Sequence, residues 1–166
     1  MGGSMAGLLA ARVLADYHDR VTIIERDSVG EWAEPRKGTP QDRHVHGFWA
    51  RGLETVERLF PGVTAELHGG GAVPGDAVGD VNWHQFGGLK LRTPTGIGAT
   101  LMTRPFLESH VRRRTLALPT ISMRSGATVT DLTTSEEHRQ VSGVYVLGAG
   151  GAREAIEADL VVDATG

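Results

Sequence analysis

The sequence contains no cysteine among its 166 residues. This absence excludes disulfide bonds, thiolate metal ligands, redox-active dithiols and a flavin attached through cysteine. Long apolar runs are also missing, and none approaches the roughly 20 residues of a membrane-spanning helix. The opening residues, Met1 to Met5, lack the basic region of a signal peptide. These absences are compatible with a cytoplasmic protein that has no transmembrane segment.

A strong charge of one sign is missing as well. The chain has 17 Lys and Arg against 20 Asp and Glu, a formal net charge of −3. This balance favours neither nucleic acid nor an anionic membrane as the main partner. Hydrophobic residues make up 40% and charged residues 22%, as in a globular protein of one domain. The 23 glycines stand at separate places and indicate many tight turns.

The order of apolar runs, glycines and prolines predicts an α/β fold with antiparallel insertions. Residues 21–24 form an apolar run without alternation, which is typical of a buried parallel strand. The β-like runs between 128 and 157 predict an antiparallel meander, and we find no linker between domains. Helices are expected over about 4–17, 45–60, 64–71 and 104–116, and strands over about 77–85, 89–92, 99–102, 121–123, 128–134, 140–147, 153–157 and 160–162, with a loop over 27–43.

The most informative motif lies at the start of the chain. The segment Gly2-Gly3-Ser4-Met5-Ala6-Gly7 fits the pattern G-x-G-x-x-G, with Ser4 in the place of the second glycine. The pattern supplies a tight turn, close approach of the backbone to a pyrophosphate and close packing of the following helix. The amino end of that helix offers free N–H groups to the phosphates. A turn of purely structural use is the alternative interpretation.

The strand that follows carries an acidic partner for this turn. Glu25 ends the run 21–24 and lies 18 residues after Gly7, near the spacing of about 20 that a ribose-binding acid shows. A carboxylate in that place accepts bonds from ribose hydroxyls and repels a 2′-phosphate, which favours FAD or NAD over NADP. Only Met1 precedes Gly2, so we expect the first strand of the doubly wound sheet to be missing from a truncated chain or one with a misassigned start.

With these motifs, the chain resembles the FAD-dependent monooxygenases of the aromatic-hydroxylase type (2-polyprenyl-6-methoxyphenol hydroxylase-like) and their relatives, the geranylgeranyl-reductase-like and flavin halogenase-like proteins. The segment 36–41 resembles the family loop that carries an Arg beside the flavin's ribityl and phosphate groups. The segment 103–114 resembles its S/T-R-x-x-L-E helix, whose leading Arg lies near FAD. The segment 126–132 resembles the strand that meets the adenine. The end of the chain, Asp163-Ala164-Thr165-Gly166, resembles its second fingerprint, with Thr165 where Asp is common.

The resemblance implies a Rossmann-like FAD-binding domain of the glutathione-reductase type that lacks its first strand and its C-terminal part. Residues 1–166 would form a partial FAD/NAD(P)-binding domain, and the strands at about 77–102 would belong to a substrate-side sheet. The cofactor-binding residues that we expect are Gly2, Gly3, Ser4, Gly7, Glu25, Arg26, Arg36, Arg104, Val129 and Gly166. No catalytic side chain is assigned.

The same resemblance implies non-covalently bound FAD, NAD(P)H as co-substrate and hydroxylation of a small hydrophobic or aromatic molecule. One alternative is a flavin-dependent polyprenyl reductase or halogenase, which the D-A-T-G ending favours. Another is an inactive fragment without catalysis of its own. The substrate, the choice of NADH or NADPH and the oligomeric state stay open.

Other residues receive simpler interpretations. His44 and His46 have no third ligand at a useful spacing, so no metal site is expected. The run 112–114 of three arginines indicates a solvated helix face rather than a nucleic-acid contact. Phe48, Trp49 and Leu53 fit a core stripe better than a wall of the substrate pocket.

Overall fold

The computed structural model describes residues 1–30, 34–135 and 139–166. The helices are α1 (Met5–Leu14), α2 (Ala50–Leu59), α3 (Val63–Gly69) and α4 (Arg104–Leu116), with a 3-10 helix η1 at Pro40–Arg43. The strands are β1 (Val21–Glu25), β2 (Val45–Trp49), β3 (Val73–Asp76), β4 (His84–Gln85), β5 (Gly88–Leu89), β6 (Gly98–Thr103), β7 (Ile121–Ser125), β8 (Thr128–Thr134), β9 (Val141–Leu147) and β10 (Arg153–Glu157).

The chain divides into two compact units. Met1–Pro40 and Val111–Gly166 form the first unit, and Gln41–His110 form the second. None of the helices in the described ranges has the length and apolar composition that crossing a bilayer requires. The predicted loop at 27–43 includes residues 31–33, which lie outside the described residues.

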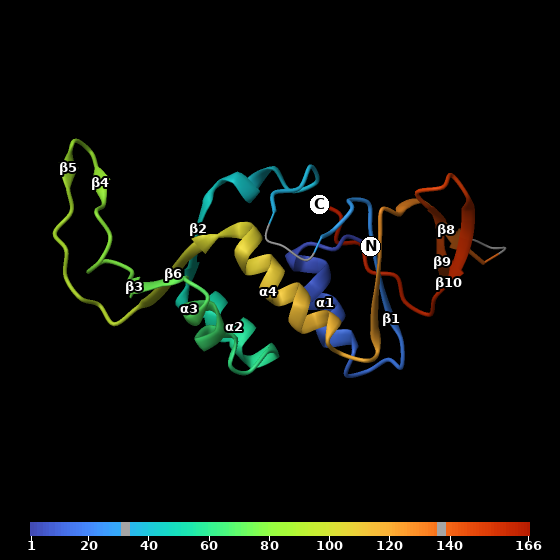
Figure 1. Ribbon diagram of the computed structural model, residues 1–166, viewed down its shortest axis with the longest axis horizontal. Coiled ribbons are helices and arrows are strands. Elements are labelled where there is room, and N and C mark those ends of the chain that lie inside the picture. The colour runs from blue at the N-terminus through green and yellow to red at the C-terminus, as the bar shows by residue number, and fades with distance from the viewer. Residues whose placement is uncertain (31–33, 136–138) are drawn as a thin grey trace. The chain divides into compact units, whose positions relative to one another are not determined.

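The first unit contains a parallel pair of strands. β1 pairs in parallel with β7, from Val21 opposite Ile121 to Glu25 opposite Ser125, and the two strands lie side by side in Figure 1. α1 packs on β1, with Leu8 and Ala11 buried on its inner face. The β-α-β order and the parallel pairing confirm the predicted α/β class.

An antiparallel meander completes this unit. Its strand order is β10-β9-β8, as the sequence predicts. Val144 and Val146 of β9 join Ile24 and Ala127 in a buried apolar cluster, against which Met1, Val129, Ile156 and Val161 pack. The apolar core therefore lies between β1 and the meander.

The second unit contains an antiparallel sheet of order β2-β6-β3. α2 packs against β2, β6 and α3. Glu57 of α2 accepts hydrogen bonds from the N–H groups of Gly62 (2.6 Å) and Thr64 (2.9 Å). These bonds fix the turn into α3, which begins after the left-handed Gly62.

A long excursion leaves this sheet between β3 and β6. It covers residues 77–97 and carries the short pair β4–β5, and Figure 1 shows it extended away from the sheet. Its turn has positive φ at Phe86 (53°) and Gly87 (79°), as a two-residue hairpin turn requires. The side chains of Phe86 and Leu91 are 97% and 86% exposed.

Three predicted elements differ from the structure. The predicted helix over 45–60 is wrong in its first part, because Val45–Trp49 forms β2 and pairs with β6. The hairpin predicted over 77–85 and 89–92 is reduced to β4 and β5. Residues 160–162 are not in a strand. β3, which the sequence did not predict, contains Pro74 and lies at the edge of its sheet, where a missing N–H is tolerated.

Candidate nucleotide-binding site

The site is built on the turn that leads into α1. Gly2 has φ of 89°, a left-handed conformation that favours glycine, and its N–H donates to the carbonyl of Ile24 (2.9 Å). A Cβ at Gly2 would overlap the carbonyl of Ala164, and one at Gly7 would overlap the carbonyl of Gly2. Glycine is therefore required at both ends of the motif by close backbone packing.

Glu25 closes the turn from the end of β1. Its Oε2 accepts the N–H of Gly3 at 2.6 Å, and its Oε1 accepts the N–H of Asp27 at 2.9 Å. The residue is only 6% exposed. A Cβ at Gly3 would lie 2.9 Å from the Cβ of Glu25, so this glycine lets the carboxylate reach the backbone. The predicted partnership of the glycine turn with Glu25 is thus present as a direct contact.

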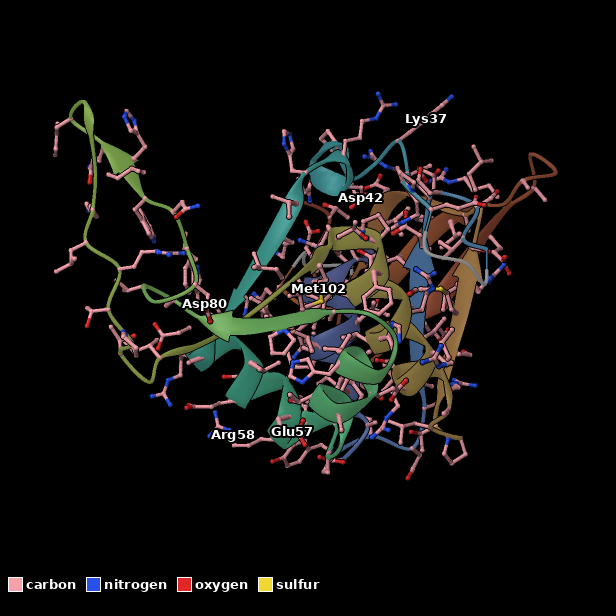
Figure 2. The ribbon with its side chains drawn as sticks, turned by 60° about the vertical axis from the view of Figure 1, so that its left-hand side comes forward. Lys37, Asp42, Glu57, Arg58, Asp80 and Met102 are labelled. Atoms are coloured by element: carbon pink, nitrogen blue, oxygen red, sulfur yellow. The ribbon has the colours of Figure 1, made fainter. Side chains whose placement is uncertain are left out.

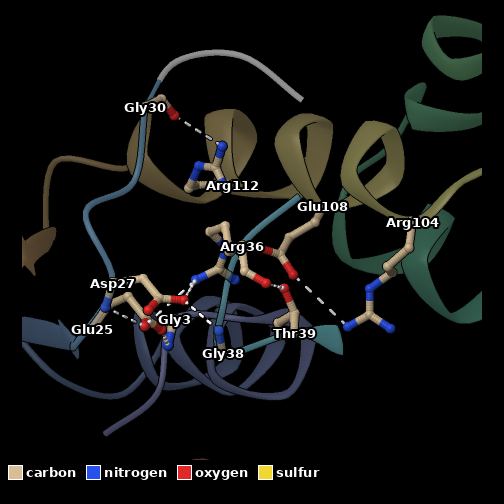
Figure 3. A network of polar contacts seen from close by, with 10 residues as sticks. All are labelled: Gly3, Glu25, Asp27, Gly30, Arg36, Gly38, Thr39, Arg104, Glu108 and Arg112. Carbon is tan, nitrogen blue, oxygen red and sulfur yellow. Dashed lines mark hydrogen bonds and ion pairs between the residues drawn. The ribbon is translucent and has the colours of Figure 1, made fainter. Parts of the chain in front are cut away.

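Arg36 lies against this carboxylate and against its neighbour Asp27, as Figure 3 shows. Its Nη1 is 3.5 Å from Oε1 of Glu25 and 3.6 Å from Oδ2 of Asp27. The Arg36 side chain is 9% exposed. The N–H of Gly38 also donates to Oδ2 of Asp27 (3.0 Å). The paired charges therefore hold the segment after β1 beside the glycine turn.

The amino end of α1 points its first N–H groups out of this turn. The first intrahelical bond runs from Leu8 N–H to the carbonyl of Ser4 (2.9 Å), so the N–H groups of Met5, Ala6 and Gly7 precede the helical ladder. Ser4 has extended dihedral angles and makes no side-chain capping bond. Free N–H groups and the positive end of a helix dipole suit a diphosphate.

The end of the chain lies beside the same turn. The N–H of Ala164 donates to the carbonyl of Met1 (2.9 Å). Asp163 Oδ1 accepts the hydroxyl of Thr165 (2.7 Å) and its N–H (3.0 Å). The bond from the hydroxyl has the larger effect and the bond from the N–H the next, and together they hold the pKa of the Asp163 carboxyl below its usual value. Gly166 follows, exposed, with φ of 81°.

The remaining predicted contacts have different surroundings. Arg26 is exposed beside Glu25. Val129 pairs with Val146 and packs against the apolar cluster. Arg104 begins α4 in the second unit, where its Nη2 lies 3.8 Å from Oε2 of the buried Glu108. The structure brings Gly2, Gly3, Ser4, Gly7, Glu25 and Arg36 together. The cofactor contacts of these residues, and those of Arg26, Arg104, Val129 and Gly166, stay predictions.

Two expectations outside this set require correction. Arg112 is not part of a solvated face: it is 8% exposed, and its Nη2 donates to the carbonyl of Gly30 (3.0 Å). Trp49 is not a core residue, because it is 46% exposed on the sheet β2-β6-β3. Asp27 was missed as a member of the site, although its place two residues after Glu25 puts it at the same end of β1.

His44 and His46, which were weighed as metal ligands, belong to the second unit. His44 is exposed, and His46 of β2 is partly buried. Desolvation, followed by the positive charge of Arg104, lowers the pKa of His46 below its usual value. In the described parts of the chain, no group of three or more His, Asp or Glu side chains is placed to hold a metal ion.

Comparisons with known proteins give the fold a broader context. No family model matches the sequence. The chain is 36% identical to the protein Rv3254 of Mycobacterium tuberculosis over the whole chain, and it spans 37% of the length of that relative.

Solved structures are similar at lower identity. PqsL of Pseudomonas aeruginosa, a probable FAD-dependent monooxygenase that was also solved with 2-aminobenzoylacetate, is 17% identical, with a TM-score of 0.67 over 92% of this chain and 38% of that chain. The flavin-dependent monooxygenase PieE, solved with FAD and substrate, is 18% identical, with a TM-score of 0.66 over 95% of this chain and 28% of that chain. The chain therefore shares the fold of part of these flavin-dependent monooxygenases.

Proposed function

We propose that this chain is the nucleotide-binding portion of an FAD-dependent oxidoreductase of the monooxygenase superfamily, with a Rossmann-like fold of the glutathione-reductase type. The observation that carries the proposal is the buried Glu25 carboxylate, which lies 2.6 Å from the N–H of Gly3 at the amino end of α1. An acid for the ribose and open N–H groups for the diphosphate lie within one turn.

The residues present fit the adenosine half of FAD. A carboxylate offers about four acceptor positions, and the Glu25 carboxylate contacts Gly3, Asp27 and Arg36 in the described part of the chain. Room for a ribose hydroxyl on this carboxylate therefore remains. The negative charges of Glu25 and Asp27 disfavour a 2′-phosphate at the same place.

For the whole protein we propose an NAD(P)H-dependent monooxygenase that hydroxylates a small hydrophobic or aromatic molecule. Support comes from the neighbours: two are flavin-dependent monooxygenases by name, and PqsL binds 2-aminobenzoylacetate. Bound FAD supplies the redox chemistry, and the residues of this chain bind and orient it. The strands at about 77–102 would be this chain's share of the substrate-side sheet, and most of that sheet would come from the rest of the whole protein.

A second candidate is a flavin-dependent polyprenyl reductase or halogenase. The ending Asp163-Ala164-Thr165-Gly166 favours it, because Thr165 stands where Asp is common in the monooxygenase pattern. The N–H and the hydroxyl of Thr165 both donate to Asp163. Substrate-stimulated consumption of O₂ and NAD(P)H, with a hydroxylated product, would support the monooxygenase. A saturated prenyl chain or a halogenated product would identify the alternative.

The flavin proposal is tested by releasing the cofactor. The full-length parent protein is purified, denatured, and its supernatant is analysed by visible absorption and by chromatography against FAD, FMN and NAD standards. We expect about one FAD per chain and its loss in a Glu25→Ala variant. A parent that folds but releases no flavin, and takes up none when incubated with FAD, would contradict the proposal.

A further inference from the structure

The excursion 77–97 of the second unit is exposed along most of its length. Every residue from 82 to 98 is exposed, and Figure 1 shows this part of the chain extended away from the sheet β2-β6-β3. Four residues near its tip are large and apolar, with exposed fractions of 97% for Phe86, 86% for Leu91, 71% for Leu89 and 41% for Trp83. A dense group of exposed apolar side chains is typical of a surface that binds a partner.

The tip is a hairpin whose two faces differ. His84 pairs with Leu89 across β4 and β5, and the N–H of Lys90 donates to the carbonyl of Trp83 (2.8 Å). Because successive side chains of a strand alternate between faces, Leu89 lies on one face, and Trp83 and Lys90 lie on the other. There the Lys90 Nζ is 5.4 Å from the centre of the Trp83 ring. The hairpin thus has an aliphatic face and a face with a cation beside an indole.

Phe86 occupies a position in the turn that favours small residues. It forms a two-residue turn with Gly87, and both residues have positive φ. Asn, Asp and Gly are the usual residues at the first position of such a turn, and a bulky residue with positive φ is an outlier. The Phe86 side chain is 97% exposed, so the described part of the chain gains no packing from it. An outlier of this kind indicates a function for the side chain rather than for the fold.

The charge of this segment differs from that of the whole chain. The chain has 20 Asp and Glu residues and a net charge of −3, but no acidic residue lies between Asp80 and Glu108. The same stretch contains Lys90, Arg92 and Arg104, of which the first two belong to the excursion. The tip is therefore locally basic. It attracts an anionic partner and repels a second copy of itself, which would bring the same two cations.

We propose that the tip, residues 83–92, docks on the surface of a bilayer that contains anionic phospholipids. Phe86 and Leu89 enter the boundary between headgroups and acyl chains, and Lys90 and Arg92 stay at the level of the phosphates. Interfacial segments have this distribution, with apolar side chains about 5–10 Å deep and basic ones at the headgroups. Trp83 suits the headgroup level, because an indole has an apolar ring and a polar N–H.

Other anionic partners fit the tip less well. A nucleic acid would meet only the two cations of the tip, and the aliphatic side chains of Leu89 and Leu91 have no counterpart on a phosphate backbone. An acidic protein surface would leave the same apolar side chains in contact with charge. A bilayer surface offers an anionic layer above an apolar one, so it can satisfy both kinds of side chain at once.

The base of the excursion holds the tip in place. Asp76 accepts N–H bonds from Gly79 (2.7 Å) and Gly96 (2.7 Å), which lie at its two ends. The tip itself has only the short pair β4–β5, and a two-stranded ribbon with both faces in water is marginally stable. Contact of one face with a bilayer would supply the missing cover, while the carboxylate of Asp76 keeps the point of departure fixed.

The first test removes the ring at the tip. Phe86→Asn is made in the full-length parent protein, which is sedimented with vesicles of phosphatidylcholine alone or of phosphatidylcholine and phosphatidylserine in equal amounts. Asn-Gly is a preferred pair for this turn, so the variant preserves the hairpin. We expect the wild type to bind the mixed vesicles and Phe86→Asn to bind them at least about tenfold more weakly. Tyr17→Asn, which removes a ring that is 78% exposed in the first unit, should bind like the wild type.

The second test removes the basic side chains. Lys90→Gln with Arg92→Gln is compared with Arg51→Gln and Arg58→Gln, an exposed pair on α2. Each Lys or Arg near an anionic surface strengthens binding about fivefold. The first pair should therefore bind the mixed vesicles at least about tenfold more weakly, and the control pair should not. Equal effects of the two pairs would overturn the proposal, because both change the net charge by the same amount.

The remaining outcomes also decide the proposal. A parent protein that binds neither kind of vesicle would overturn it. So would a lower melting temperature of Phe86→Asn without vesicles, which would show that the ring packs inside the whole protein, or a dimer that this variant loses in light scattering, which would assign the tip to a second copy. Binding to the vesicles by a parent that releases no flavin would support the docking tip and contradict only the proposed function.

Discussion

At the scale of single residues, Glu25 is the side chain on which most of the site depends. Replacing it by Ala removes the acceptors of the Gly3 and Asp27 N–H groups and one partner of the buried Arg36. We expect a loss of about 3 kcal/mol in unfolding free energy, because a buried partner is left uncompensated, and at least a tenfold weaker affinity for FAD. Urea denaturation and fluorescence titration measure the two effects.

The matched control is Glu54→Ala, which removes an exposed carboxylate paired with Arg51 across α2. Its effect should stay below about 0.5 kcal/mol, because exposed ion pairs contribute little. Similar losses in both variants would show that Glu25 has no special role.

Gly7 gives a second prediction at this scale. The Cβ of Ala at position 7 would overlap the carbonyl of Gly2, so Gly7→Ala must push α1 away from the turn. We expect a loss of at least about 2 kcal/mol, measured by thermal denaturation, together with loss of FAD binding. Gly69→Ala in α3, where a Cβ meets nothing within 4 Å, should be neutral or stabilising by less than about 1 kcal/mol.

The sequence was sufficient to predict this part of the site because its geometry is local. A glycine turn, a helix start and an acid at the end of the next strand define their own contacts by spacing alone. Asp27 and Arg112 were not predicted as structural members, because their partners come from the segment between β1 and η1. The residue types of that segment do not determine its path, so its contacts with Asp27 and Arg112 could not be predicted from the sequence.

At the scale of elements, the predictions that succeeded are those with strong local determinants. α4 begins at Arg104 with Pro105 in its first turn, as predicted, and the meander follows its alternating runs. β2 was predicted as the start of a helix over 45–60, whose apolar face of Leu53, Val56 and Leu59-Phe60 belongs to α2 and its end. Its pairing with β6, 50 to 58 residues away in sequence, prevails over that local pattern.

The excursion 77–97 shows the opposite case, an element whose two ends are bonded to one side chain. Asp76 accepts N–H bonds from Val78, Gly79, Thr95 and Gly96 and the hydroxyl of Thr95. Asp80, seen beside β3 in Figure 2, in turn accepts the N–H of Asp76 (2.7 Å). Both ends of the excursion therefore meet at one carboxylate.

These bonds, with those from Gly79 and Val78 the largest, hold the pKa of Asp76 well below its usual 3.8. A depressed folded-state pKa stabilises the ionised form, so the contribution is complete above the unfolded value and is lost as the pH falls through the folded value. We expect Asp76→Asn to increase hydrogen exchange at residues 95–97 at pH 7, while the wild type loses this protection only well below pH 3.8. Asp131→Asn, which affects one local bond to Leu132, should leave these amides unchanged.

At the scale of the whole molecule, two runs that were predicted as strands pair along little or none of their length. The run 160–162 has the composition of a strand but is not one, since among the described residues Met1 alone forms backbone bonds along it. The hairpin 77–92 has strand-like residues but shrinks to β4 and β5, because an isolated two-stranded ribbon without a covering face is marginal. A run with strand-like composition therefore forms a strand only where a neighbouring strand is present to pair with it.

The last prediction concerns the start of the proposed diphosphate turn. Gly2 has a left-handed conformation, is held on one side by Ile24 and packs against Ala164 on the other. In Gly2→Ala the new Cβ would overlap the carbonyl of Ala164, so the turn would be displaced, and a site that is no longer pre-organised binds more weakly. We expect Gly2→Ala to raise the Kd for FAD at least about tenfold, as measured by flavin fluorescence quenching. The matched control is Gly151→Ala, because Gly151 also has positive φ but a Cβ there meets nothing within 4 Å, and its Kd should stay unchanged. Equal affinities in the two variants would show that the close packing of Gly2 does not shape the site.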